Sequence, residues 1–77
     1  ITLGRDKGND IVLDERLVSR RHAVIQKIGQ EYFLEDLGST NGTQVNGQRV
    51  PPRAFVHLRL DDTVLIGRTE LSLRHLR

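Results

Sequence analysis

Two short polar segments carry most of the side chains in this 77-residue sequence that could bind a ligand. The first, 18–23, places a hydroxyl and two guanidiniums directly before an apolar run, and the second, 36–43, combines hydroxyls, an amide and two glycines. Hydroxyls and glycine-freed backbone N–H groups make a good anion cradle, and the arginine fork suits phosphate or carboxylate. The segments therefore indicate anion recognition, although an Asn-Gly pair such as Asn41-Gly42 is equally typical of a hairpin turn.

Catalytic and metal-binding arrangements are poorly supported. Ser19, His22 and Asp36 have the residue types of a hydrolase triad, but Ser19 and His22 are close in sequence and no oxyanion loop is evident. The other histidines, His57 and His75, lack metal-site spacing, and the chain has no cysteine, no P-loop pattern and no dinucleotide fingerprint. We expect no catalytic residues, no metal, no cofactor and no enzymatic activity.

The elements that must position these segments are short strands. Turn signals interrupt the chain throughout, and no stretch keeps a helical apolar stripe. The strand-like runs between the turns are 1–3, 10–13, 22–28, 31–36, 55–58, 63–66 and 69–73. Many short strands separated by turns predict an all-β sandwich or barrel. The positions expected to face its core include Val12, Ala23, Ile25, Leu34, Val64 and Ile66.

Composition limits the size and class of the protein. The 77 residues are 36% hydrophobic with a net charge of +2, and ten of the twelve basic residues are arginine. No apolar run reaches the roughly 20 residues that a membrane helix needs. A chain of this length is expected to form one continuous domain, 1–77. Because methionine is absent even at the first position, we expect this domain to be an excerpt of a longer protein.

Blocks along almost the whole chain resemble the forkhead-associated (FHA) domain family of phosphothreonine-binding modules, in the family's order and at its spacing. These blocks are Gly4-Arg5, 9–13, 19–23, 36–43, 45–47 and Ile66-Gly67. The resemblance implies a two-sheet β-sandwich of short, mainly antiparallel strands with binding loops at one end, and a first family strand lying ahead of Ile1. It implies a module that binds phosphothreonine-containing proteins in signalling or regulation.

The resemblance also assigns roles within the phosphopeptide site. It implies that Arg5 binds the phosphate and that Ser19 donates its hydroxyl to it. Arg20 is implied to contact phosphate or peptide, and Thr40 to reach the phosphate through its hydroxyl or backbone N–H. Asn41 is implied to bind the peptide main chain.

Further residues are implied to shape the site or to select the ligand. Gly4, His22 and Gly42 are expected to support the loops. Family members often select the third residue after the phosphothreonine, and the residues placed to contact it here are Arg16, Leu17 and Gln44. Arg16 hints at an acidic residue at that ligand position.

Two other functions stay open at this point. The same sandwich could be a phosphate-independent scaffold that binds a folded partner. Nucleic-acid binding through the arginines is less favoured, because Tyr32, Phe33 and Phe55 lie in strand-like runs where core positions are expected. We expect no nucleic-acid partner, no membrane association, a monomer, and a cytoplasmic location, or a nuclear one in a eukaryote.

Overall fold

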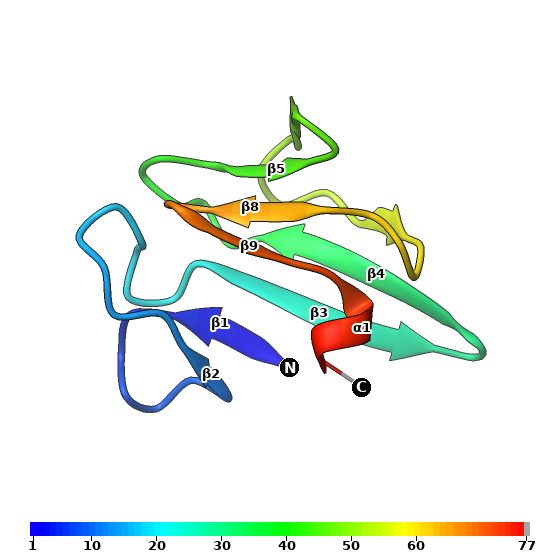
Figure 1. The fold of residues 1–77 in the computed structure, drawn as a ribbon, viewed down its shortest axis with the longest axis horizontal. Helices are drawn as coiled ribbons and strands as arrows, with labels where there is room; N and C mark the ends of the chain where they lie inside the picture. The colour runs from blue at the N-terminus through cyan, green and yellow to red at the C-terminus, as the bar shows by residue number, and fades with distance from the viewer. Residues whose placement is uncertain (77) are drawn as a thin grey trace.

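The larger of the two sheets is built around a hairpin of two six-residue strands. A computed structural model describes residues 1–76, and its five-stranded sheet has the order β2-β1-β3-β4-β7 (Figure 1). The strands are β1 (Thr2–Gly4), β2 (Ile11–Val12), β3 (Ala23–Ile28), β4 (Glu31–Asp36) and β7 (Val56–Leu58). All neighbours are antiparallel except β1 and β2. The β3–β4 turn places Gly29 at a φ of 64°, which glycine adopts without steric cost.

The second sheet has four shorter strands in the order β6-β5-β8-β9. They are β5 (Thr43–Val45), β6 (Gln48–Arg49), β8 (Val64–Ile66) and β9 (Thr69–Leu71). Val45 pairs with Gln48 across a two-residue turn in which Asn46 and Gly47 have φ values of 52° and 82°. Positive φ at both positions is the type I′ geometry that Asn-Gly favours and that matches strand twist.

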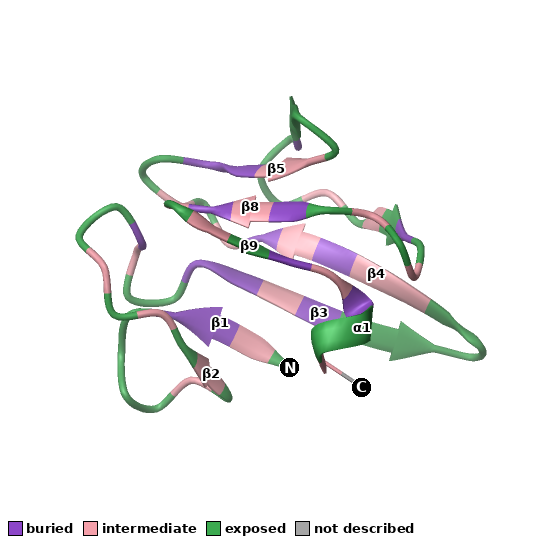
Figure 2. Ribbon diagram, viewed as in Figure 1, coloured by how far each residue is buried: buried purple, intermediate pink, exposed green. Residues whose placement is uncertain are grey.

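One apolar core lies between the two sheets, in agreement with the predicted β-sandwich. Most of the buried apolar side chains come from strands of both sheets, where burial follows the alternation of the strands (Figure 2). The core contains Leu3, Val18, Ala23, Ile25, Leu34, Val50, Leu58, Val64, Ile66, Leu71 and Leu73. The predictions of a buried Ala23, Ile25, Leu34, Val64 and Ile66 are confirmed.

The prediction for Val12 is wrong, since its side chain is 42% exposed. Leu3 pairs with Ile11, and Gly4 pairs with Val12. Leu3 belongs to the core and Ile11 packs against it, so the next residue along the strand faces outward. Register in the sheet, which the local pattern did not reveal, decides which of the two residues contributes to the core.

The remaining differences from the predicted elements involve very short segments. Strands β5 and β6 were not expected, because they lie in a segment dominated by turn signals. The last strand ends at Leu71, and α1 (Leu73–Leu76) follows it. Phe55 lies before β7 and is exposed rather than packed in the core.

Candidate functional site

Strand register brings the sequence-distant loops to one end of the sandwich. Leu3 of β1 pairs with Ala23 of β3, which also pairs with Asp36 of β4. The end of β1, the start of β3 and the end of β4 therefore lie side by side. In the other sheet Thr43 pairs with Ile66, so the start of β5 meets the end of β8. The loops leaving these positions are at the left of Figure 1.

A direct hydrogen bond joins the two polar segments singled out in the sequence. The backbone N–H of Thr40 donates to Ser19 Oγ over 3.0 Å, across 21 residues of chain. Because this bond uses only a lone pair of the hydroxyl, Ser19 keeps its own O–H for donation to a ligand. Thr40 is exposed and Ser19 is half-buried, so both hydroxyl-bearing residues remain at the surface.

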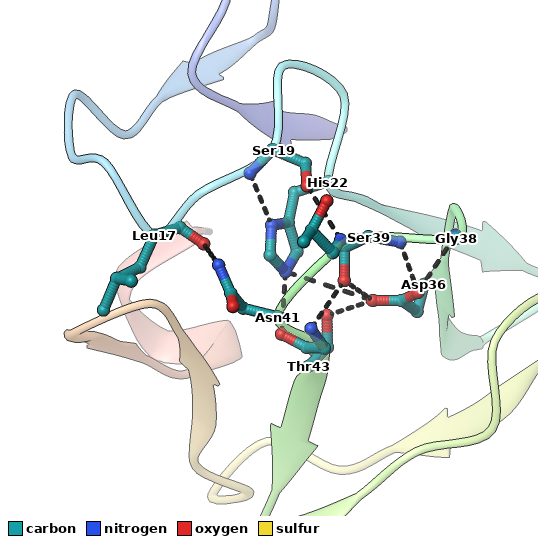
Figure 3. A network of polar contacts seen from close by, with 10 residues as sticks. Leu17, Ser19, His22, Asp36, Gly38, Ser39, Asn41 and Thr43 are labelled. Carbon is teal, nitrogen blue, oxygen red and sulfur yellow. Dashed lines mark hydrogen bonds and ion pairs between the residues drawn. The ribbon is translucent and has the colours of Figure 1, made fainter.

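Asn41 ties the same loop to a second neighbour. Its Nδ2 donates to the carbonyl oxygen of Leu17 over 3.0 Å (Figure 3). An amide has two N–H donors and one carbonyl acceptor, so Oδ1 and the second N–H of Asn41 are available to a ligand. This donor and acceptor together match the groups of a peptide main chain.

His22 lies beneath these residues and is fully buried. Its Nδ1 accepts the backbone N–H of Ser19 over 3.0 Å, so the ring proton is on Nε2, which donates to the carbonyl oxygen of Gly42 over 2.8 Å. Both ring nitrogens therefore hold loop backbone. A Ser-His-Asp triad is not formed, because His22 bonds the main chain of Ser19 rather than its hydroxyl.

Asp36 organises the loop from below (Figure 3). Its carboxylate accepts the N–H groups of Gly38 and Ser39 and the hydroxyls of Ser39 and Thr43, over 2.6–3.0 Å. Burial is the largest single influence on its pKa and raises it, but the four hydrogen bonds together outweigh burial. The pKa of Asp36 consequently lies below its ordinary value.

The Gly4-Arg5 block lies against the segment that contains Ser19. The backbone N–H of Arg5 donates to the Ser19 carbonyl over 3.0 Å, and that of Asp6 donates to the Arg20 carbonyl over 3.1 Å. A Cβ on Gly4 would overlap the carbonyl oxygen of Arg20, so only glycine permits this approach. Arg5 and Arg20 are both exposed, and within residues 1–76 no ion pair joins either to a carboxylate.

Glu15 is a contributor that the sequence did not reveal. Its Oε1 accepts the backbone N–H of Arg68, and its Oε2 accepts the hydroxyl of Thr69, each over 2.7 Å. These bonds, led by the one from Thr69, lower the pKa of Glu15. The partners are 53 and 54 residues away, so no local pattern could have indicated the link. Glu15 fixes the β2–β3 loop to the β8–β9 turn.

Two hollows lie beside the recognition loops and share Leu17. The smaller, about 170 Å³, is termed the Leu17–Leu65 pocket and is lined by Leu17, Asn41, Gly42, Gln44, Leu65 and Gly67. The larger, about 560 Å³, is termed the Arg16–Arg68 hollow and is lined by Glu15, Arg16, Leu17 and Arg68. Of the three residues expected to contact the third ligand residue, Leu17 and Gln44 line the Leu17–Leu65 pocket, whereas Arg16 lines the neighbouring hollow.

Comparison with known proteins identifies the family to which this chain belongs. The family model for the FHA domain matches residues 1–67, so the chain belongs to the FHA domain family. The transcriptional regulatory protein EmbR of Mycobacterium tuberculosis is 45% identical over 72 residues, which are 94% of this chain and 18% of EmbR. FhaB of the same organism, an FHA domain-containing protein, is 36% identical over 74 residues, 96% of this chain and 46% of FhaB.

Solved structures agree with that assignment. EmbR in complex with a low-affinity phosphopeptide matches with a TM-score of 0.85 and 42% identity, over 92% of this chain and 18% of that one. This chain spans less than half the length of the EmbR and FhaB relatives. Within residues 1–76, no helix is long and apolar enough to cross a membrane, and no cluster of three or more His, Asp or Glu side chains is arranged to hold a metal ion.

Proposed function

We propose that this chain is a binding module that recognises phosphothreonine in partner proteins and thereby acts in signalling or regulation. The observation that carries the proposal is the hydrogen bond from Thr40 N to Ser19 Oγ. It brings two hydroxyl-bearing segments together beside the backbone of Arg5, whose guanidinium has no carboxylate partner within residues 1–76. Structures of FHA domains with phosphopeptides, including EmbR, support the same assignment.

Each residue would contribute a different interaction. Arg5 would supply charge through guanidinium–phosphate hydrogen bonds, which are short and can be bidentate. Ser19 would donate the O–H that the Thr40 bond leaves unused, and Thr40 would add its hydroxyl. Arg20 would contact phosphate or peptide, and Asn41 would pair with the peptide main chain through its remaining amide groups.

The phosphate would dominate recognition of the modified residue. Phosphorylation adds about −1.5 to −2 charge and three strong acceptor oxygens, which unmodified threonine lacks. The preference for phosphothreonine over phosphoserine depends on one methyl group, worth about 0.8 kcal/mol from buried area alone. We therefore expect the phosphate preference to exceed the methyl preference by a wide margin.

The Leu17–Leu65 pocket would select the third residue after the phosphothreonine. Leu17 and Leu65 provide apolar walls, and Asn41, Gly42, Gln44 and Gly67 complete the lining. An aliphatic side chain fits this lining better than the acidic residue that Arg16 hinted at, since Arg16 does not line this pocket. We propose a preference for leucine or isoleucine at that ligand position.

The chain would act as an interaction module without catalytic residues. Its proposed location remains the cytoplasm. A phosphate-independent scaffold would leave the exposed Arg5 and the spare Ser19 O–H without a role. No observation favours that alternative, so phosphothreonine recognition is the function we put forward.

Fluorescence anisotropy with matched peptides tests this function. The peptides carry phosphothreonine, threonine or phosphoserine at one position, and the proteins are wild type, Arg5→Ala and Arg59→Ala. Arg59 is a matched control because it is an exposed arginine that lines a hollow with Gln30 and Glu31 of the β3–β4 hairpin. Hydrogen bonds to charged groups contribute about 1.5–3 kcal/mol, so Arg5→Ala should weaken phosphothreonine binding by about 10- to 100-fold.

The control should retain wild-type affinity to within about twofold, since exposed charges far from the ligand are strongly screened. Equal binding of phosphorylated and unmodified peptides by folded protein would contradict the proposal and favour the scaffold.

A further inference from the structure

The Arg16–Arg68 hollow has no role in the function proposed so far. It is larger than the Leu17–Leu65 pocket, at about 560 Å³ against about 170 Å³. The two hollows share Leu17 as a wall. The hollow therefore adjoins the pocket, within reach of the residues that follow the third one of a bound peptide.

The hollow is lined by more positive than negative side chains. Arg16 and Arg68 are both exposed, and Glu15 is the one carboxylate among the lining residues. Each oxygen of Glu15 already accepts one hydrogen bond, Oε1 from the backbone N–H of Arg68 and Oε2 from the hydroxyl of Thr69. No ion pair within residues 1–76 joins a carboxylate to either guanidinium.

The geometry therefore leaves two guanidinium forks open on a surface of net positive charge. Carboxylates are good partners for such forks, because the two N–H groups of a guanidinium match the two oxygens. Glu15 holds the β8–β9 turn through the backbone N–H of Arg68 and the hydroxyl of Thr69. The charge of Arg68 also lowers the pKa of Glu15, but within residues 1–76 no direct ion pair joins this carboxylate to the guanidinium.

We propose that the Arg16–Arg68 hollow binds an acidic side chain of the phosphopeptide, located at the fourth to sixth residue after the phosphothreonine. This inference rests on the proposed function and extends the ligand class to phosphothreonine segments followed by an aliphatic and then an acidic residue. Extended chain advances about 3.3 Å per residue, so residues directly after the third reach the adjoining hollow.

Three phosphopeptides measured by anisotropy test the subsite. All carry leucine at the third position after phosphothreonine. One has glutamate at the fourth to sixth positions, one has glutamine there, and one has glutamine there with the glutamates moved ahead of the phosphothreonine. The proteins are wild type, Arg16→Gln, Arg68→Gln and the control Arg59→Gln, which alters an exposed arginine outside the hollow.

We expect the downstream-glutamate peptide to bind wild type more tightly than either other peptide, by about two- to fivefold for each arginine engaged, as for exposed ion pairs. Arg16→Gln and Arg68→Gln should each reduce this advantage and leave the affinity for the glutamine peptide unchanged. Arg59→Gln should preserve the advantage. Higher salt should diminish it, since exposed charges are screened.

The subsite is overturned if the downstream-glutamate and glutamine peptides bind wild type equally. It is also overturned if moving the glutamates ahead of the phosphothreonine gives the same gain, because general attraction would then suffice. If no phosphorylated peptide binds folded protein, the proposed function fails and the subsite with it. If phosphopeptides bind alike whatever follows the third residue, the subsite alone fails.

Discussion

Asp36 shows how one buried side chain can set the shape of an exposed loop. It is 2% exposed and accepts hydrogen bonds from Gly38, Ser39 and Thr43, while Ser39 Oγ in turn accepts the N–H of Gly42. The loop residues assigned to ligand binding, Thr40 and Asn41, lie within this bonded stretch. Their placement therefore depends on a residue that the ligand does not reach.

Asp36→Asn should destabilise the fold strongly. Asparagine has only one acceptor oxygen. Its NH₂ group would lie against N–H or O–H donors of Gly38, Ser39 or Thr43 that contact a carboxylate oxygen in the wild type. We expect a loss of about 2–4 kcal/mol in the free energy of unfolding, in line with buried hydrogen bonds to charged groups. Urea denaturation checks this, with Glu35→Gln on the same strand as the control. A change below about 0.5 kcal/mol would contradict the role given to Asp36.

Acid should remove the same contribution. The pKa of Asp36 is lower in the folded protein than its ordinary value of 3.8, so the folded state binds fewer protons than the unfolded state at acid pH. Its stabilising effect is fully present above pH 3.8 and is lost as pH falls through the folded pKa. Denaturation between pH 6 and pH 2 should show a shallower fall for Asp36→Asn than for wild type, so that the two curves converge at low pH. Parallel curves would refute this assignment.

At the scale of elements, Glu15 connects the β2–β3 loop to the β8–β9 turn, two segments of the site that no strand pairing joins. The β2–β3 loop carries Leu17 and Ser19, and the β8–β9 turn carries Gly67 and Arg68. A Cβ on Gly67, whose φ is 61°, would come within 2.5 Å of Glu15 Oε1 and 2.9 Å of Val18 Cγ2. The carboxylate and the glycine therefore fix how closely the β2–β3 loop approaches the β8–β9 turn, the two segments from which Leu17 and Gly67 line the Leu17–Leu65 pocket.

Glu15→Gln should loosen that pocket without removing phosphate recognition. Glutamine retains one acceptor but loses the charge and one of the two oxygens that Arg68 N and Thr69 Oγ1 contact. We expect the preference for leucine over alanine at the third ligand position to fall by about threefold, a fraction of what a buried aliphatic side chain contributes. A phosphopeptide truncated before that position should bind Glu15→Gln and wild type alike.

The control for this measurement is Glu70→Gln, an exposed acidic residue on β9. A uniform loss of affinity for both the full and the truncated peptide would show that Glu15 supports the loops as a whole rather than the pocket.

At the scale of the whole molecule, the two sheets depend on one shared core. We propose that residues 1–77 form a single cooperative domain. Leu34 is fully buried at the centre of β4, between β3 and β7. Domains of this size are stabilised by only about 4–12 kcal/mol, so one core side chain represents a large share of the total.

Leu34→Ala should therefore lower the free energy of unfolding by about 2–5 kcal/mol and the melting temperature by about 12–30 °C. Circular dichroism and calorimetry should report one coincident transition. Ile28→Ala, at a half-exposed position on the neighbouring strand, should change stability far less. Two separate transitions in wild type would contradict the single cooperative unit.

Much of this architecture could be predicted from local sequence. The apolar runs 22–28 and 31–36, each bounded by turn signals, predicted β3 and β4, because short apolar runs between turns are typical of strands. Asn46-Gly47 forms the hairpin turn that this pair favours. Asn41-Gly42 does not, since its loop passes from one sheet to the other, between β4 and β5. The same dipeptide thus forms a hairpin turn only where its flanking strands pair with each other.

The sequence by itself determined the residue types and their order: the hydroxyls, arginines, amide and glycines of the candidate site, and the strands between them. Tertiary structure alone decided what those residues touch. Register placed Val12 outward and set Thr40 against Ser19. Packing brought Glu15 to Arg68 and opened a hollow beside Leu17. The physical reason is that strand alternation is a local property, whereas pairing joins segments whose separation along the chain leaves no periodic trace.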